Sequence, residues 1–218
     1  MSENAFVKAG ITSVTIPDSV TNIGKWAFWK CAKLATVNIG NGITNIGIAA
    51  FQECTSLTSI TIPGSVTNIE NGSFSKCAKL TSVTIGNGVT TIGAQAFREC
   101  KSLSSITIPS SVTTIEGSAF AKCAKLASVI IENGVTNIGI AAFQECTSLT
   151  SIIITDNVIN IANQAFAKCS KLANVTFEGN IDSENFSPDN TFPGDLRAKY
   201  LAEGIGTYTK KGSKWTKS

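Results

Sequence analysis

The chain has 218 residues, a formal net charge of +3 and no histidine. A charge this small, with 18 Lys and Arg residues dispersed along the chain, argues against a nucleic-acid interface. The lack of His removes the commonest general base and a frequent metal ligand. No run of 18 apolar residues predicts a membrane-spanning helix, and the first residues lack the basic and apolar segments of a signal peptide.

Residues 1–10 precede a repeating pattern that begins at Ile11, so they are expected to form an incomplete first turn. From there, Phe, Leu, Ile and Cys recur at a fixed interval of 23 residues. The cysteines of this pattern are Cys31, Cys54, Cys77, Cys100, Cys123, Cys146 and Cys169. A fixed period of 20 to 50 residues indicates a repeat architecture, in which each unit buries its apolar face against the next.

Each unit begins with alternating apolar and polar residues, as in Ser82-Val83-Thr84-Ile85. This alternation, with its β-branched residues, predicts a half-buried strand that ends at the following Gly or Pro. The later stretch of the unit, for example 94–100, is too short for a stable isolated helix. We expect it to form one turn of α- or 3₁₀-helix on the return path. One strand per 23 residues, always with the same heading, predicts a parallel sheet.

The repeated motif is clearest in two runs, Cys54-x-x-Leu57-x-x-Ile60-x-Ile62-Pro63 and Ala96-Phe97-x-x-Cys100. The motif resembles leucine-rich repeats, and within them the BspA-like (Treponema-type) group, over roughly residues 11–177. The resemblance implies an α/β solenoid: a leucine-rich-repeat horseshoe with one parallel β-strand per repeat and short helical turns on its convex side. Gly or Ser, as at Gly88 and Ser111, stands where the general pattern has Asn or Cys, so an inward ladder of Asn is not expected.

We expect the chain to divide into a solenoid over residues 1–178 and a C-terminal cap over residues 179–218. The solenoid contains seven full repeats over residues 11–171 and partial turns at its ends. In the cap, 195–202 predicts a short helix, and 207–209 with 214–216 predicts a hairpin. A polar cap suits a solenoid, because the last turn would otherwise expose its core.

A second period of 46 residues runs inside the first, because some positions alternate between odd and even units. Pro follows the strand at Pro17, Pro63 and Pro109, whereas Gly follows it at Gly40 and Gly86. The residues directly before the cysteines are Lys30, Glu53, Lys76, Glu99, Lys122, Glu145 and Lys168. Stacked turns would place these opposite charges side by side, which avoids the repulsion of like charges; exposed pairs add only about 0–1 kcal/mol each.

Neither the cysteines nor the carboxylates predict chemistry. A straight column of single thiols cannot surround a metal ion, and parallel side chains on stacked turns are too far apart for disulfides. The thiols are expected to be small buried hydrophobes. Glu70 and Glu116 lie two turns apart, roughly 10 Å by strand spacing, which could imitate an inverting glycosidase, but turn capping or solvation explains them better. We therefore predict no enzyme activity, no metal and no cofactor.

The outward residues of the strands form small, polar, uncharged columns that become apolar at Ile130 and Ile153. The candidate protein-binding residues on this concave face are Ser59, Thr61, Ser82, Thr84, Ser105, Thr107, Ser128, Ile130, Ser151 and Ile153. Solenoids commonly bind proteins through such a face. The sequence thus favours a non-enzymatic protein-interaction or adhesion module, and the resemblance implies a host or cell-surface protein as partner.

Two alternatives stay open. Thr and Ser also suit an exposed strand face without a ligand, in which case the chain is a structural spacer or a scaffold that associates end to end. Ser-x-Thr columns also resemble ice-binding solenoids, although curvature and the interruptions at Asn38, Ile130 and Ile153 count against that function. The localisation is open as well: the resembled group is often exported, and the first residues carry no signal peptide.

Overall fold

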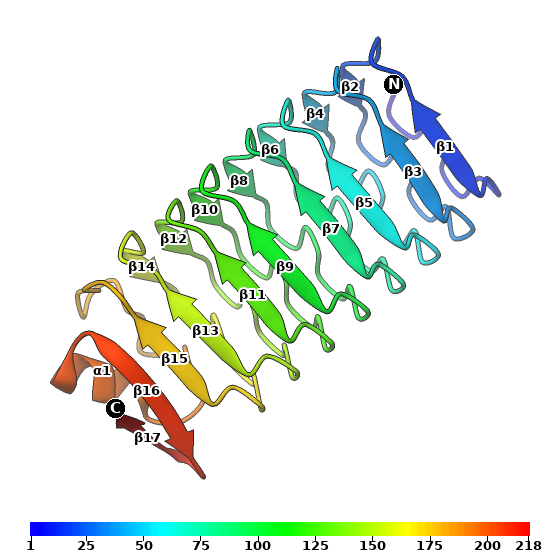
Figure 1. Ribbon diagram of the computed structural model, residues 1–218. Helices are drawn as coiled ribbons and strands as arrows, with labels where there is room; N and C mark the ends of the chain where they lie inside the picture. The colour runs from blue at the N-terminus through cyan, green and yellow to red at the C-terminus, as the bar shows by residue number, and fades with distance from the viewer.

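Each 23-residue repeat makes one turn of a β-solenoid, and the turns stack side by side along one axis (Figure 1). The computed structural model describes all 218 residues. Every turn contributes one four-residue strand to the same side of the molecule. These long strands are β1 (Ser13–Ile16), β3 (Thr36–Ile39), β5 (Ser59–Ile62), β7 (Ser82–Ile85), β9 (Ser105–Ile108), β11 (Ser128–Ile131), β13 (Ser151–Ile154) and β15 (Asn174–Phe177). They run parallel, and equivalent residues of paired strands lie opposite each other, as Val14 does to Val37.

Each turn also carries a second, two-residue strand that the sequence analysis does not predict. These strands form a continuous seven-stranded parallel sheet behind the long strands in the view of Figure 1. They are β2 (Asn22–Ile23), β4 (Asn45–Ile46), β6 (Asn68–Ile69), β8 (Thr91–Ile92), β10 (Thr114–Ile115), β12 (Asn137–Ile138) and β14 (Asn160–Ile161). The Ile of each strand is fully buried, and its polar neighbour faces outward.

The return segment after each short strand consists of overlapping β-turns, where the sequence analysis expects a turn of helix. The amides of Ala96 and Arg98 each donate to a carbonyl three residues earlier, both at 3.1 Å. Gln95 and Glu99 have φ angles of 58° and 60°. Left-handed residues at these positions interrupt a right-handed helix. They also turn the amide of Gln95 toward the next turn, where it donates to Gly117 O at 2.9 Å.

The stack is nearly straight in Figure 1, with much less curvature than a horseshoe. A horseshoe curves when helices about 10 Å wide spread its convex side. In this chain turns occupy that side, and the ring centroids of the Phe residues there repeat at 5.0–5.4 Å. That interval is close to the ~4.8 Å between neighbouring strands. The face of the long strands is therefore almost flat.

One continuous core of 61 buried residues fills the space between the two sheets and the turns. Its most regular feature is a stack of Phe rings, one from each turn, with interplanar angles of 3–7°. Phe6 and Phe192 extend the stack at its two ends, at 5.2 and 4.6 Å from Phe28 and Phe166. The stack thus joins the partial first turn, the repeats and the C-terminal segment into one core.

The 46-residue period has a structural counterpart in the long strands. They are hydrogen-bonded in four pairs, β1–β3, β5–β7, β9–β11 and β13–β15, and we call the three junctions between pairs seams. Within a pair, the amide of Gly86 donates to Ile62 O at 2.9 Å. At two seams the equivalent residues are Pro63 and Pro109, which have no amide hydrogen to donate. Proline therefore interrupts the ladder at these two seams, and the third seam, between β11 and β13, has Thr155 at the equivalent position.

The position three residues after each long strand from β1 to β11 alternates between Ser and Gly, as at Gly88 and Ser111, and this alternation follows from the pairing of the long strands. A Cβ on Gly88 would lie 1.8 Å from the carbonyl oxygen of Gly64, so only glycine allows this close approach. On the seam side, Ser111 occupies the equivalent position, and its hydroxyl donates to Val89 O at 2.7 Å. An inward Asn ladder is absent because backbone approach and serine hydroxyls fill these positions.

The C-terminal segment closes one end of the stack with α1 (Leu196–Glu203), β16 (Gly206–Lys211) and β17 (Lys214–Lys217). The predicted helix and hairpin are thus both present. β16 pairs antiparallel with β15 and so adds the hairpin to the long-strand sheet. Trp215 is fully buried, and its indole nitrogen donates to Pro193 O at 2.7 Å.

The N-terminal end is covered only in part. The amides of Asn4, Phe6 and Lys8 donate to the return segment of the first full turn, at 2.7–3.1 Å. Residues 1–10 contribute no strand, so β1 has β3 as its one neighbour and keeps a free edge. The expected incomplete turn is therefore present, and it leaves one strand edge open.

Candidate functional site

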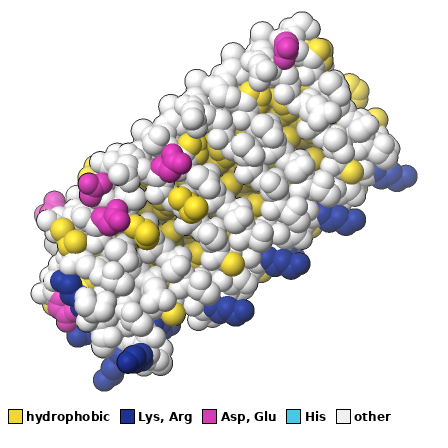
Figure 2. Space-filling view, in the orientation of Figure 1, with side chains coloured by type: hydrophobic (Ala, Val, Ile, Leu, Met, Phe, Trp, Pro, Cys, Tyr) yellow, Lys and Arg dark blue, Asp and Glu magenta, His cyan; other side chains and the backbone are white.

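The long-strand face exposes all ten candidate binding residues, while the side chains that alternate with them are buried. β5, β7 and β9 present only Ser and Thr outward, as in Ser59 and Thr61. Figure 2 shows this face as a broad, mostly uncharged strip, with charged side chains along its edges. The face offers hydroxyl groups as hydrogen-bond donors and acceptors, and its outward residues include no titratable side chain.

Two isoleucines interrupt this polar face toward the C-terminal half. Ile130 and Ile153 are 55% and 51% exposed, at positions where β5, β7 and β9 carry Thr. They occupy consecutive turns on either side of the seam between β11 and β13 and line the same groove. We call these two residues the isoleucine patch.

Shallow grooves mark two of the three seams. The larger, of about 320 Å³, lies between β7 and β9 and is lined by Ser82, Thr84, Ser105 and Thr107 together with Pro109 and Glu132. The smaller, of about 210 Å³, lies between β11 and β13 beside the isoleucine patch. Thr155 replaces proline in this second seam, and its buried hydroxyl has no hydrogen-bond partner. The sequence signal for the first groove is Pro109, whereas the second groove has Thr155 at the equivalent position and carries no such signal.

The cysteines form a hydrogen-bonded column inside the turns. All seven are free and fully buried. In each inner turn the Phe carbonyl accepts two bonds: Phe74 O accepts from the amide of Cys77 at 3.3 Å and from the thiol of Cys100 at 3.2 Å. Burial raises the pKa of the Cys77, Cys123 and Cys169 thiols to about 12. These thiols stay protonated at neutral pH and are poor nucleophiles, so the column is structural.

Of the two carboxylates that lie two turns apart, Glu70 and Glu116, the second has a structural role. Glu116 Oε2 accepts a hydrogen bond from the amide of Ala94 at 2.9 Å, which caps the return segment of the preceding turn. Asn71 Oδ1 accepts from the same amide, also at 2.9 Å. The protein has no cluster of three or more Cys, Asp or Glu side chains that could hold a metal ion. Its one helix has eight residues, too few to cross a bilayer.

The Lys/Glu column before the cysteines forms ion pairs between turns, but not at every step. Glu53 lies between Lys30 and Lys76, with N–O distances of 3.8 and 3.7 Å. Glu145 pairs with Lys168 at 3.4 Å. Glu99 instead pairs with Arg98 in its own turn. All these pairs are partly exposed, so they stabilise the fold only slightly and mainly keep like charges apart.

Comparisons with known proteins found several solved structures that are similar to this chain. A leucine-rich repeat protein of T. pallidum is 32% identical, with a TM-score of 0.64, and the match covers 68% of this chain and 70% of that one. The pneumococcal vaccine antigen PcpA is 18% identical, with a TM-score of 0.56, over 88% of this chain and 62% of that one. A leucine-rich repeat protein of Bacteroides ovatus is 25% identical, with a TM-score of 0.45, over 79% of this chain and 57% of that one. No curated protein matches the sequence.

The repeat itself identifies the family. Six copies of the family described as "BspA type Leucine rich repeat region" match residues 1–126 and 71–189, which together span most of the chain. The fixed 23-residue period, the stacked parallel strands and the similarity to the T. pallidum protein point the same way. The chain belongs to the BspA-type leucine-rich repeat family.

Proposed function

We propose that this protein is a protein-interaction or adhesion module that binds a partner protein through its long-strand face. Proteins built from such repeats are generally interaction or surface proteins, and the fold typically serves as a non-enzymatic scaffold. The partner sits across several turns and is held by many small contacts. This mode suits a face that is nearly flat and rich in Ser and Thr hydroxyls.

The isoleucine patch is the observation that carries this proposal. Ile130 and Ile153 are each about half exposed over a groove, on a sheet face that is otherwise polar. Covering the exposed half of both side chains would stabilise a complex by roughly 1.5–3 kcal/mol. That amount is small beside the energy of a tight interface, and the face lacks the Tyr, Trp and Arg anchors of strong hot spots. We therefore expect weak binding that gains strength from several copies of either partner.

A pair of matched substitutions tests the proposal. Ile130→Glu places a charge in the isoleucine patch, and Ile140→Glu places the same charge on an isoleucine that is 60% exposed outside the long strands. Partners captured from host and bacterial extracts by the unaltered protein should be lost with Ile130→Glu and retained with Ile140→Glu. A triple substitution of Thr61, Thr84 and Thr107 by Glu should also abolish capture. If partners bind both the patch variant and the triple variant normally, the long-strand face is not the binding surface.

End-to-end association is a second candidate, supported by the free edge of β1. An unpaired strand edge offers backbone donors and acceptors to another chain. Sedimentation at increasing protein concentration measures this association directly. Replacing Thr15 by Pro removes a backbone donor on the free edge of β1, because the amides that face β3 belong to the alternate residues of the strand. This substitution should lower any self-association. A protein that remains monomeric at high concentration would remove this candidate.

Because the face is nearly flat, curvature does not argue against an ice-binding surface. The interruptions at Asn38, Ile130 and Ile153 remain, because they break the regular hydroxyl columns. A thermal-hysteresis measurement at high protein concentration decides this point, and we expect no activity.

A further inference from the structure

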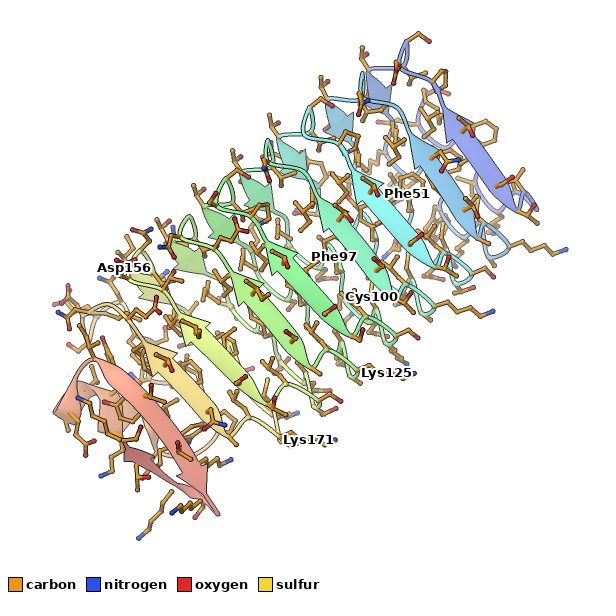
Figure 3. All side chains as sticks on the ribbon, in the orientation of Figure 1. Phe51, Phe97, Cys100, Lys125, Asp156 and Lys171 are labelled. Carbon is orange, nitrogen blue, oxygen red and sulfur yellow. The ribbon has the colours of Figure 1, made fainter.

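A row of lysines borders the long-strand face on the side where the strands begin. Its members stand two residues after the cysteine in every second turn: Lys33, Lys79, Lys125 and Lys171. Figure 2 shows the basic side chains at regular intervals along this edge, and in Figure 3 Lys125 and Lys171 extend away from the body of the solenoid. All four are exposed, and none lies within 4.0 Å of a carboxylate. We call them the lysine row.

The lysine row differs from the neighbouring Lys/Glu column in that nothing neutralises it. Before the cysteines, lysine alternates with glutamate from turn to turn, and ion pairs form there. In the lysine row the intervening turns carry Ser56, Ser102 and Ser148 instead. The row therefore keeps its full positive charge along the whole stack.

The fold fixes the spacing of the lysine row. Hydrogen bonds tie its loops together: Thr55 Oγ1 donates to Ala32 O at 3.4 Å, and Thr147 Oγ1 donates to Ala124 O at 3.3 Å. Lysines two turns apart are separated by roughly 10 Å, twice the strand spacing of ~4.8 Å. This separation is about one Debye length in physiological salt, so the charges repel each other only weakly.

The C-terminal cap continues the row. The amide of Lys210 donates to Ala173 O at 2.8 Å, two residues after Lys171. The tip of the β16–β17 hairpin therefore brings Lys211 and Lys214 to the same edge of the sheet. The basic edge thus runs from the first full turn to the end of the molecule.

We propose that the lysine row binds a linear acidic polysaccharide, a sugar chain with a carboxylate or sulfate group at regular intervals. A stiff sugar chain laid along the edge would meet one ammonium group every two turns. The adjoining Ser and Thr columns of the long-strand face supply hydroxyl groups that can hydrogen-bond to sugar hydroxyls. A single-stranded nucleic acid fits less well, because the adjoining face offers no aromatic side chain on which its bases could stack.

The experiment compares two variants with the same net charge. The row variant replaces Lys33, Lys79, Lys125 and Lys171 by Ser, the residue of the intervening turns. The control variant replaces Lys8, Lys25, Lys122 and Lys217 by Gln; these lysines lie outside the row and also have no carboxylate within 4.0 Å. Circular dichroism checks that both variants are folded. If the row variant is not folded, the double variant Lys79→Ser/Lys125→Ser replaces it.

Binding is measured on immobilised heparin, alginate and uncharged dextran at several salt concentrations. Heparin and alginate separate a sulfated from a carboxylated chain, and binding to either one supports the proposal. Four ionic contacts predict that log affinity falls with log salt with a slope of up to about 3. The row variant should lose roughly tenfold or more in affinity and most of this slope. The control variant and Ile130→Glu should bind nearly as the unaltered protein does.

Three outcomes would overturn the proposal. The first is no binding of the unaltered protein to heparin or alginate even at low salt. The second is an equal loss in the row and control variants, which would show that net charge alone decides. The third is binding that occurs only to vesicles with anionic lipids, tested beside neutral vesicles, which would make the basic edge a membrane contact.

Discussion

Raising the pH from 8 to 10 should destabilise the fold through its buried cysteines. Burial raises the pKa of the Cys77, Cys123 and Cys169 thiols to about 12, from an ordinary value of 9.0. The folded protein therefore holds these protons more tightly than the unfolded chain does. Their contribution to stability is complete below pH 9 and is lost as the pH rises above 9, because the unfolded chain then releases protons that the folded protein retains.

The size of the effect follows from the unfolded chain. At pH 10 a thiol with a pKa of 9.0 is largely ionised, whereas a thiol with a pKa of about 12 is still protonated. The free energy of unfolding therefore falls by about 1.4 kcal/mol for each thiol between pH 8 and pH 10. The three thiols together predict a loss of about 4 kcal/mol, which is large beside a typical total stability of ~5–15 kcal/mol. Burial also raises the pKa of the other cysteines and adds in the same direction.

Urea unfolding at pH 8, 9 and 10, followed by circular dichroism with a reducing agent present, measures this loss. The control is the triple variant Cys77→Ser, Cys123→Ser and Cys169→Ser. Serine can still donate to the Phe carbonyl of the preceding turn but does not ionise in this range. The triple variant should lose about 4 kcal/mol less than the unaltered protein between pH 8 and pH 10. Equal losses in the two proteins would refute the reasoning.

Two further predictions concern the turns. Gly88→Ala should lower the free energy of unfolding by about 1–3 kcal/mol or more, because its Cβ would meet Gly64 O at 1.8 Å. Gly64→Ala has no atom within 3.8 Å of the new Cβ and should change stability by no more than about 0.5 kcal/mol; similar losses in urea unfolding would contradict this account. Timed labelling with a thiol reagent and mass spectrometry should find Cys31 modified first, because only the partial first turn covers it, through a hydrogen bond to Phe6 O at 2.8 Å. Inner cysteines such as Cys100 should react only on unfolding, and fast labelling there would contradict a structural role.

The sequence by itself determined the repeat, the strand positions and the pattern of burial. A residue such as Phe97 or Cys100 recurs every 23 residues because each turn offers it the same environment, so one unit predicts all the others. The same reasoning predicted exposed hydroxyl columns around Thr84 and the exposed isoleucines at Ile130 and Ile153, and the structure confirms that these side chains face outward. Whether they bind a partner remains a prediction.

Only the tertiary structure decided how neighbouring turns meet. The two-residue strands exist because adjacent turns pair their backbones there, which no single repeat can show. Left-handed residues such as Gln95 replace the expected helical turn, because their amides bond to the next turn instead of their own. Narrow turns on that side then leave the stack nearly straight. The seams, their grooves and the un-neutralised lysine row likewise follow from contacts between turns, where proline lacks a donor and only glycine allows close approach.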